Sequence, residues 1–185
     1  IIHLSGVTWN DFERLLEIRG DRPVPRFTFL EGELELMSPS KSHEKIKSVI
    51  GRLIETYCLE KGIRFTIVGA WLLKEQAKER GVEPDECYIF GSDDADRPHL
   101  AIEVFWTSGQ IDKLEVYRQL GVREVWFWRR GRIESFALRD EKYELITESE
   151  VLPGLAPKLV AQFLDRKTTF DAIQDFRAAL VDQTK

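Results

Sequence analysis

Two strongly apolar segments with a helix-forming segment between them constrain the fold of this chain more than any other feature. Residues 100–105 and 122–128 have the composition of buried strands. Between them, residues 110–120 are expected to form a helix that ends at Gly121. A strand, a helix and a second strand in this order form a crossover unit whose strands lie parallel. The sequence therefore predicts an α/β fold with a central mixed sheet flanked by helices.

The second of these strands is apolar on both sides. Successive side chains of a strand point to opposite faces of the sheet, so Trp126 and Trp128 should face one way, and Val125 and Phe127 the other. A strand that buries both faces belongs in the centre of a sheet. We therefore expect residues 122–128 to lie in the middle of the fold.

The remaining elements follow from apolar periodicity and from turn residues. An N-terminal helix capped by Thr8 should precede a β-hairpin formed by residues 26–30 and 33–37, whose turn is Glu31-Gly32. A long amphipathic helix is predicted over residues 42–60. The later predictions are a strand over 65–74 bent at Gly69, a charged loop over 75–81, a buried strand over 86–90, an acidic loop over 91–98, strands over 132–138 and 143–147, and helices over 161–164 and 169–180.

Length and composition favour a single soluble domain. The 185 residues are typical of one domain, expected here over residues 1–185. No apolar run approaches the roughly 18 residues that span a bilayer, so we expect no membrane partner. Cys58 and Cys87 lie in apolar segments and predict no disulfide framework, which favours a reducing cytoplasm. The chain does not begin with methionine, so further residues upstream are expected.

The charge distribution bears on nucleic-acid binding. A net charge of −5 argues against a strong non-specific DNA-binding protein, because such proteins are usually basic. A local basic surface is still compatible with this charge. Arg129, Arg130 and Arg132 cluster at the tip of a predicted hairpin, where they could contact phosphate, although a solvated turn is the simpler interpretation.

Two carboxylates occupy positions where a charge is costly. Asp85 follows Pro84 at the entrance of an apolar strand, and Glu103 lies inside the apolar segment 100–105. A buried carboxylate must be paired or must bind a cation. A divalent ion held jointly by Asp85 and Glu103 is one solution, and Mg²⁺ suits such a site. A structural salt bridge, for example between Glu103 and Lys113, is the alternative.

Further candidates lie near these acids in the predicted fold. Lys113 lies in the first turn of the helix after Glu103, where a lysine can orient water or stabilise negative charge. His43 stands at the start of the long helix and could bind metal or transfer a proton, although a packing or capping role is the alternative. Glu33 and Glu44 join His43 as second-tier candidates.

Several short motifs occur along the chain in a fixed order. They are Gly32-Glu33-Leu34, Met37-Ser38-Pro39 with His43, Pro84-Asp85, Ile102-Glu103-Val104, Lys113 with Tyr117, Gly121-Val122, and Glu124-Val125-Trp126. In this order, from about residue 8 to residue 165, they resemble the Uma2 family (DUF820), a restriction endonuclease domain of the PD-(D/E)xK nuclease superfamily.

The resemblance implies a restriction-endonuclease-like fold and a metal-dependent endonuclease acting on nucleic acid, with DNA as the first expectation. It implies that Asp85 and Glu103 bind Mg²⁺ or Mn²⁺, that Lys113 is the catalytic lysine, and that the chain forms a homodimer. Two departures are visible: Phe105 stands where the superfamily commonly has its lysine, and Trp106-Thr107-Ser108 replaces the usual SPS. The alternative is a catalytically inactive nuclease-like fold that acts as a nucleic-acid or protein interaction module.

Overall fold

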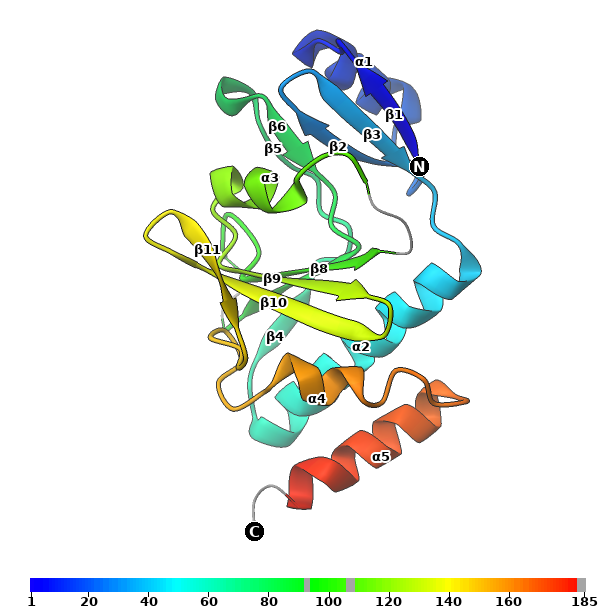
Figure 1. Ribbon diagram of the computed structural model, residues 1–185, viewed down its shortest axis with the longest axis vertical. Coiled ribbons are helices and arrows are strands. Elements are labelled where there is room, and N and C mark those ends of the chain that lie inside the picture. The colour runs from blue at the N-terminus through cyan, green and yellow to red at the C-terminus, as the bar shows by residue number, and fades with distance from the viewer. Residues whose placement is uncertain (92–93, 106–108, 183–185) are drawn as a thin grey trace.

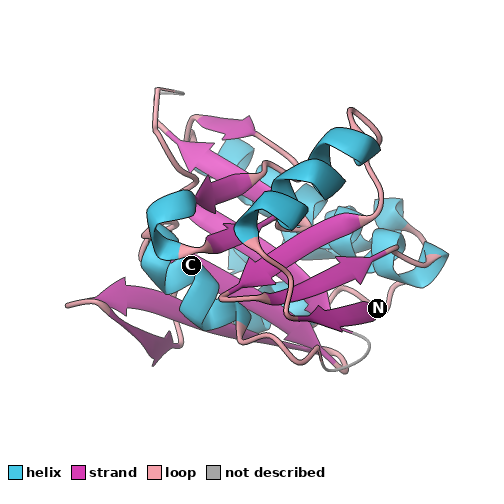
Figure 2. Ribbon diagram, turned by 90° about the horizontal axis from the view of Figure 1, so that it is seen from above, coloured by secondary structure: helices cyan, strands magenta, loops and turns pink. Residues whose placement is uncertain are grey.

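A computed structural model of the chain describes residues 1–91, 94–105 and 109–182, which form two β-sheets and their covering helices (Figure 1). The large sheet has the strand order β11-β10-β9-β8-β7-β4, and the small sheet has the order β1-β3-β2-β6-β5. Helices and strands are spread through the whole molecule, which confirms the predicted α/β class (Figure 2).

The predicted parallel pair forms the middle of the large sheet. Strand β8 (Leu100–Phe105) lies parallel to β9 (Glu124–Arg129), with Ile102 opposite Trp126. The tryptophans of β9 pack into one core cluster, whereas Val125 and Phe127 pack into another on the opposite face. The prediction that this strand is central and buried on both faces is therefore confirmed.

Antiparallel strands extend the large sheet on both sides of this pair. Strand β10 (Arg132–Arg139) turns back from β9 at Arg130-Gly131, and β11 (Lys142–Ile146) follows it at the edge. On the other side lie β7 (Glu86–Phe90) and the short β4 (Phe65–Ile67).

Helices cover one face of the large sheet. Helix α2 (Lys41–Lys61) begins at the cap Ser40, whose side chain accepts a hydrogen bond from the His43 N–H, and it ends at Gly62 in the left-handed conformation. Its apolar stripe packs on the tryptophan face of β9 together with α5 (Thr169–Asp182) and α4 (Pro157–Ala161).

Helix α3 and the small sheet lie on the opposite face (Figure 1). Helix α3 (Lys113–Leu120) contributes Val116, Tyr117 and Leu120 to the core cluster that contains Val125 of β9. Leu73 and Val82 of the small sheet belong to the same cluster, so the two sheets share a core.

The small sheet is built on the predicted hairpin. Strands β2 (Arg26–Leu30) and β3 (Glu33–Met37) pair around Glu31 and Gly32, whose φ angles of 45° and 89° match the type I′ turn of two-residue hairpins. Helix α1 (Trp9–Arg19), capped by Thr8 as predicted, packs its buried Phe12 against Phe27 and Phe29. Strand β1 (Ile2–Ser5), which no sequence pattern indicated, adds the edge beside β3.

The prediction for residues 65–81 was wrong in its pairing. The expected single bent strand is divided between β4 of the large sheet and β5 (Leu73–Glu75) of the small sheet, because Gly69 turns the chain with a φ of 67°. The expected charged loop contains the short 3₁₀ helix η1 (Gln76–Lys78) and strand β6 (Arg80–Val82), which pairs with both β2 and β5. Gly81 is required in β6, since an added Cβ would lie 2.7 Å from the Phe12 ring.

Other element boundaries also shift. Helix α3 begins at residue 113 rather than 110, and α4 covers 157–161 rather than 161–164. Part of the predicted loop 91–98 and the tripeptide Trp106-Thr107-Ser108 fall outside the described residues. No helix among those described is both long and apolar enough to cross a membrane.

A buried carboxylate at the start of β9 holds this strand to the loop after β11. Glu124 is fully buried and accepts hydrogen bonds from the Trp126 indole at 2.5 Å and from the backbone N–H groups of Glu150 at 2.8 Å and Val151 at 3.1 Å. We predict that Glu124→Ala lowers the free energy of unfolding by about 3 kcal/mol, because the buried Trp126 indole and two partly buried backbone N–H groups lose their acceptor. Urea denaturation measures the change, and Glu134→Ala on the exposed side of β10 is the control. Equal stability of the two variants would contradict this role.

Candidate active site

The start of β7 and the middle of β8 bring Asp85 and Glu103 to neighbouring positions. The register between these antiparallel strands places Glu86 opposite Ile102, so Asp85 and Glu103 occupy the next pair of positions along the ladder. Directly opposite residues project from the same face of a sheet. Both side chains are about 1% exposed, and the negative charge of Asp85 acts on Glu103.

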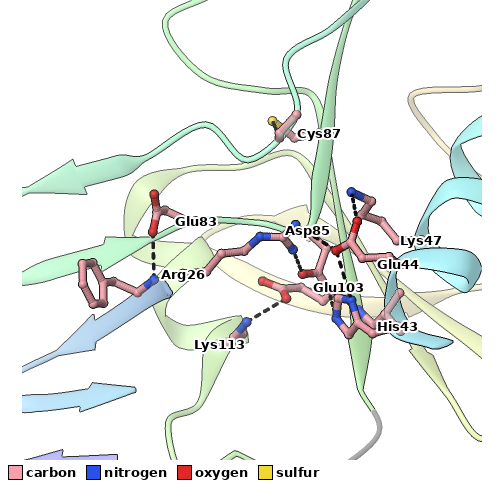
Figure 3. Close-up of polar contacts among 12 residues, drawn as sticks. Arg26, His43, Glu44, Lys47, Glu83, Asp85, Cys87, Glu103 and Lys113 are labelled. Carbon is pink, nitrogen blue, oxygen red and sulfur yellow. Dashed lines mark hydrogen bonds and ion pairs between the residues drawn. The ribbon is translucent and has the colours of Figure 1, made fainter. Parts of the chain in front are cut away.

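Asp85 is surrounded by groups that favour its ionised form. Oδ1 forms an ion pair with the Arg26 guanidinium of β2, and Oδ2 lies 2.9 Å from Nε2 of His43 on α2 (Figure 3). The Val104 N–H donates to Oδ2 at 2.7 Å. Burial by itself would raise the pKa of Asp85, but the hydrogen bond from His43 and the charges of Lys113 and Arg26 outweigh it and lower the pKa below its usual range. Asp85 is therefore ionised at neutral pH.

The pKa of Glu103 is shifted in the opposite direction, upward. Its Oε2 lies 2.7 Å from Nζ of Lys113, and its Oε1 accepts a hydrogen bond from the Tyr117 hydroxyl at 2.5 Å. Burial raises the pKa of Glu103, and the negative charge of Asp85 raises it further, although Lys113 acts in the other direction. The environment therefore shifts the pKa values of the two acids in opposite directions, down for Asp85 and up for Glu103.

Lys113 reaches Glu103 because α3 begins later than the sequence predicted. Asp112 is the N-cap, and its Oδ1 accepts hydrogen bonds from the N–H groups of Leu114 at 3.0 Å and Glu115 at 3.3 Å. Lys113 is consequently the first residue of the helix and points back to β8. The Glu103–Lys113 ion pair, which the sequence left open as an alternative to metal binding, is present in the structure.

Glu35 is a site residue that the sequence did not single out. It is 4% exposed, lies on β3, and accepts hydrogen bonds from the backbone N–H groups of Gln110 and Ile111, the latter at 3.0 Å. Gly109 packs against it so closely that a Cβ there would lie 2.7 Å from a Glu35 oxygen. Glu35 therefore fixes the segment that leads into α3 and Lys113. Nothing in the alternating Glu33-Leu34-Glu35-Leu36 pattern distinguishes Glu35 from Glu33.

Of the second-tier candidates His43, Glu44 and Glu33, the structure brings only the first two to the site. His43 and Glu44 lie beside Asp85: His43 contacts the acid directly, and Glu44 accepts a hydrogen bond from Arg26 at 3.3 Å. Glu33 is at the opposite end of β3 from these groups and contacts Ser5 at 2.8 Å and His3 at 2.9 Å, so the structure does not bring it to the site. Arg26 was also missed, because one arginine at the start of an apolar strand gives no indication of its partner.

A cavity of about 170 Å³ opens beside Glu103. Glu35, His43, Glu103, Val104, Phe105 and Lys113 are among the residues that line it. A small ion or a phosphate oxygen entering this cavity would meet the carboxylate of Glu103 and the ammonium of Lys113.

The donor set fits a hard divalent cation. Mg²⁺ is commonly held by one or two carboxylates, with waters and substrate oxygens completing its coordination. Asp85 and Glu103 supply two such carboxylates. Burial and, to a smaller extent, the charge of Asp85 raise the pKa of Glu103, and a cation bound by both acids would offset that charge. Within the part of the chain that the structure describes, no group of three or more His, Cys, Asp or Glu residues is arranged to hold a metal. The fit therefore rests on the two acids alone.

The opposite pKa directions predict different effects of neutralising each acid. Asp85→Asn should lower the free energy of unfolding at pH 7 by about 3 kcal/mol, because Arg26 and His43 lose a buried ionised partner. Glu103→Gln should have a much smaller effect, because the folded protein disfavours its ionised form. Urea titrations compare the variants at pH 7.

The pH dependence provides a second check on the same pair. The pKa of Asp85 is lower in the folded protein than its ordinary value of 3.8, so its contribution should be present above that pH and disappear as the pH falls further. A larger loss from Glu103→Gln than from Asp85→Asn at pH 7 would contradict these directions.

Comparisons with known proteins agree with this architecture. The model of the Uma2 family, described as "Putative restriction endonuclease", matches residues 9–171. A solved structure described as a putative nuclease belonging to DUF820, from Anabaena variabilis ATCC 29413, is 14% identical and superimposes with a TM-score of 0.51, covering 92% of this chain and 99% of that one. At this identity the likeness shows a shared fold. None of the curated proteins compared with the chain matches it significantly. Because the family model spans most of its length, the chain belongs to the Uma2 family.

Proposed function

We propose that this chain is a metal-dependent endonuclease that hydrolyses phosphodiester bonds of nucleic acid, with DNA as the first candidate substrate. The observation that carries the proposal is the pair of buried acids, Asp85 and Glu103, on neighbouring positions of one sheet face, with Lys113 in contact with Glu103 at the cavity. The family assignment, which indicates a nuclease, supports the same reaction class.

Asp85 and Glu103 would hold Mg²⁺ or Mn²⁺. When bound, such an ion polarises a phosphate oxygen and makes water more acidic. The surrounding residues hold the two carboxylates in place: the Val104 N–H and His43 fix Asp85, and the Tyr117 hydroxyl fixes Glu103. Preorganised ligands of this kind need no rearrangement when the reaction begins.

Lys113 would act on the reacting groups themselves. Its ammonium lines the cavity and lies 2.7 Å from Glu103, so it can donate a hydrogen bond to a water or to a phosphate oxygen that enters there. In hydrolysis, the water oxygen bonds to phosphorus while an ester P–O bond breaks, and negative charge accumulates on the phosphate oxygens. A lysine at this position stabilises that charge.

A non-catalytic interaction module is the second candidate, and one observation favours it. Each acid already forms an ion pair with a side chain of the protein, Asp85 with Arg26 and Glu103 with Lys113. Such a site can be stable without a metal. The module would bind nucleic acid or protein through the same fold without hydrolysis.

A nicking assay distinguishes the two candidates. We predict that the wild type converts supercoiled plasmid DNA to nicked and linear forms with Mg²⁺ or Mn²⁺ and not with EDTA. Asp85→Asn and Glu103→Gln should lower the rate at least about 100-fold, because each removes a metal ligand. Asp140→Asn is the matched control, since Asp140 lies in an exposed turn with a φ of 43° that asparagine tolerates.

Circular dichroism must show that each variant is folded before rates are compared. Equal cleavage by the wild type and both acid variants would indicate a contaminating nuclease. No cleavage by any folded protein, with either metal and with DNA or RNA, would favour the interaction module.

The lysine can be tested separately from the metal ligands. Lys113→Gln should lower kcat by about 100-fold with a small change in KM, because the interaction strengthens as charge develops on the phosphate. Lys78→Gln on the exposed 3₁₀ helix is the control. A variant that keeps its kcat would limit Lys113 to a structural ion pair with Glu103.

A further inference from the structure

Three arginines at the turn between β9 and β10 form a group that we call the arginine tip: Arg129, Arg130 and Arg132. Arg129 ends β9, Arg130 and Gly131 make the turn, and Arg132 begins β10; all three arginines are exposed. Across the residues that the structure describes, no carboxylate forms an ion pair or a hydrogen bond with any of them. No ion pair with another described residue therefore compensates their positive charges.

Other exposed arginines that form no ion pair among the described residues, such as Arg14, Arg64 and Arg123, are scattered along the chain, and several more are paired with carboxylates. Arg139 contacts Glu144 and Glu150, Arg166 contacts Asp165 and Asp175, and Arg177 contacts Glu60. The arginine tip is also unfavourable for folding, because Arg129 lies directly opposite Arg132 in the strand pair and like charges at opposite positions destabilise a sheet. A basic group that costs stability, in a chain with a net charge of −5, indicates a role in binding an anionic partner.

The arginine tip begins at the border of the candidate active site. Strands β8 and β9 run in the same direction toward this turn, and the register places Arg129 opposite Phe105, two positions beyond Glu103 (Figure 1). The Arg129 guanidinium lies 4.5 Å from the centre of the Phe105 ring, and the Lys113 ammonium lies 5.5 Å from the same ring. Cation–π contacts on one ring thus connect the tip to the lysine that contacts Glu103.

We propose that the arginine tip binds the phosphodiester backbone of a nucleic acid and holds the strand across the candidate active site. This inference rests on the proposed nuclease function. Guanidinium groups bind phosphate oxygens with two parallel hydrogen bonds and remain charged at every physiological pH. Contacts to phosphate position a nucleic acid without reading its bases. The tip therefore supplies affinity and orientation, and it adds no sequence preference.

Salt-dependent binding tests this proposal without relying on hydrolysis. Fluorescence anisotropy measures the affinity of the full chain in EDTA for a labelled duplex DNA and for a labelled single-stranded RNA, over a range of KCl concentrations. For the probe that binds, Arg129→Gln/Arg130→Gln/Arg132→Gln should weaken binding at least about tenfold at low salt. For duplex DNA, the plot of log K against log salt should become less steep. The magnitude of its negative slope should decrease by about 3, roughly 1 for each lost phosphate contact. Two DNA duplexes of different sequence should be affected equally.

The matched control removes the same amount of charge from paired arginines. Arg139→Gln/Arg166→Gln/Arg177→Gln should leave the slope nearly unchanged, because exposed ion pairs contribute little to stability and these residues lie outside the tip. Equal weakening by both triple variants would show a general effect of net charge and overturn the proposal.

Two further outcomes separate the tip from the nuclease function itself. Wild-type affinity retained by the tip variant, together with metal-dependent cleavage, would overturn the role of the tip alone. Failure of the wild type to bind either probe would contradict both the tip and a nucleic-acid substrate.

Discussion

The antiparallel pairing of β7 with β8 decides where the proposed chemistry would take place in this chain. Its register puts Asp85 and Glu103 on neighbouring positions of one sheet face, and a slip of one residue would send one acid to the opposite face. Two buried carboxylates this close repel each other, so the fold must supply compensation. Arg26, His43, Lys113, Tyr117 and the Val104 N–H provide it. These groups come from the small sheet, α2, α3 and β8. Contacts from four parts of the fold therefore stabilise this pair of acids.

The two carboxylates are not compensated equally, and this difference affects how each could bind a cation. Asp85 is held between an arginine and a histidine and keeps its charge, whereas burial and its neighbour raise the pKa of Glu103. A fully neutralised pair would attract no cation, and an uncompensated pair would destabilise the fold. The observed arrangement lies between these limits, which is typical of sites that trade stability for function.

Local sequence predicted the elements whose formation depends on local interactions. Helix caps at Thr8 and Gly62, the Glu31-Gly32 turn and the two-faced strand β9 all follow from neighbouring residues, and each is present. Strand β6 was missed because its three residues gain strand character by pairing with β5 and with β2, the latter about 50 positions earlier in the chain. The site shows the same division: burial identified Asp85 and Glu103 as unusual, while Glu35 and Arg26 acquire their positions only through contacts between the sheets. Glu33, which lies on the same strand as Glu35, contacts Ser5 and His3 instead.

The residues of the candidate site come from both sheets, and this affects how local unfolding would disrupt the site. The two acids belong to the large sheet, which has its own core around Trp126, whereas Arg26 and Glu35 belong to the N-terminal hairpin of the small sheet. Local opening of a peripheral unit generally requires less free energy than global unfolding. Detachment or proteolytic clipping of that hairpin would strip Asp85 of its guanidinium partner and free the segment before Lys113, while the tryptophan core stayed intact. We therefore expect the proposed activity to be lost in a separate event from global denaturation of this fold.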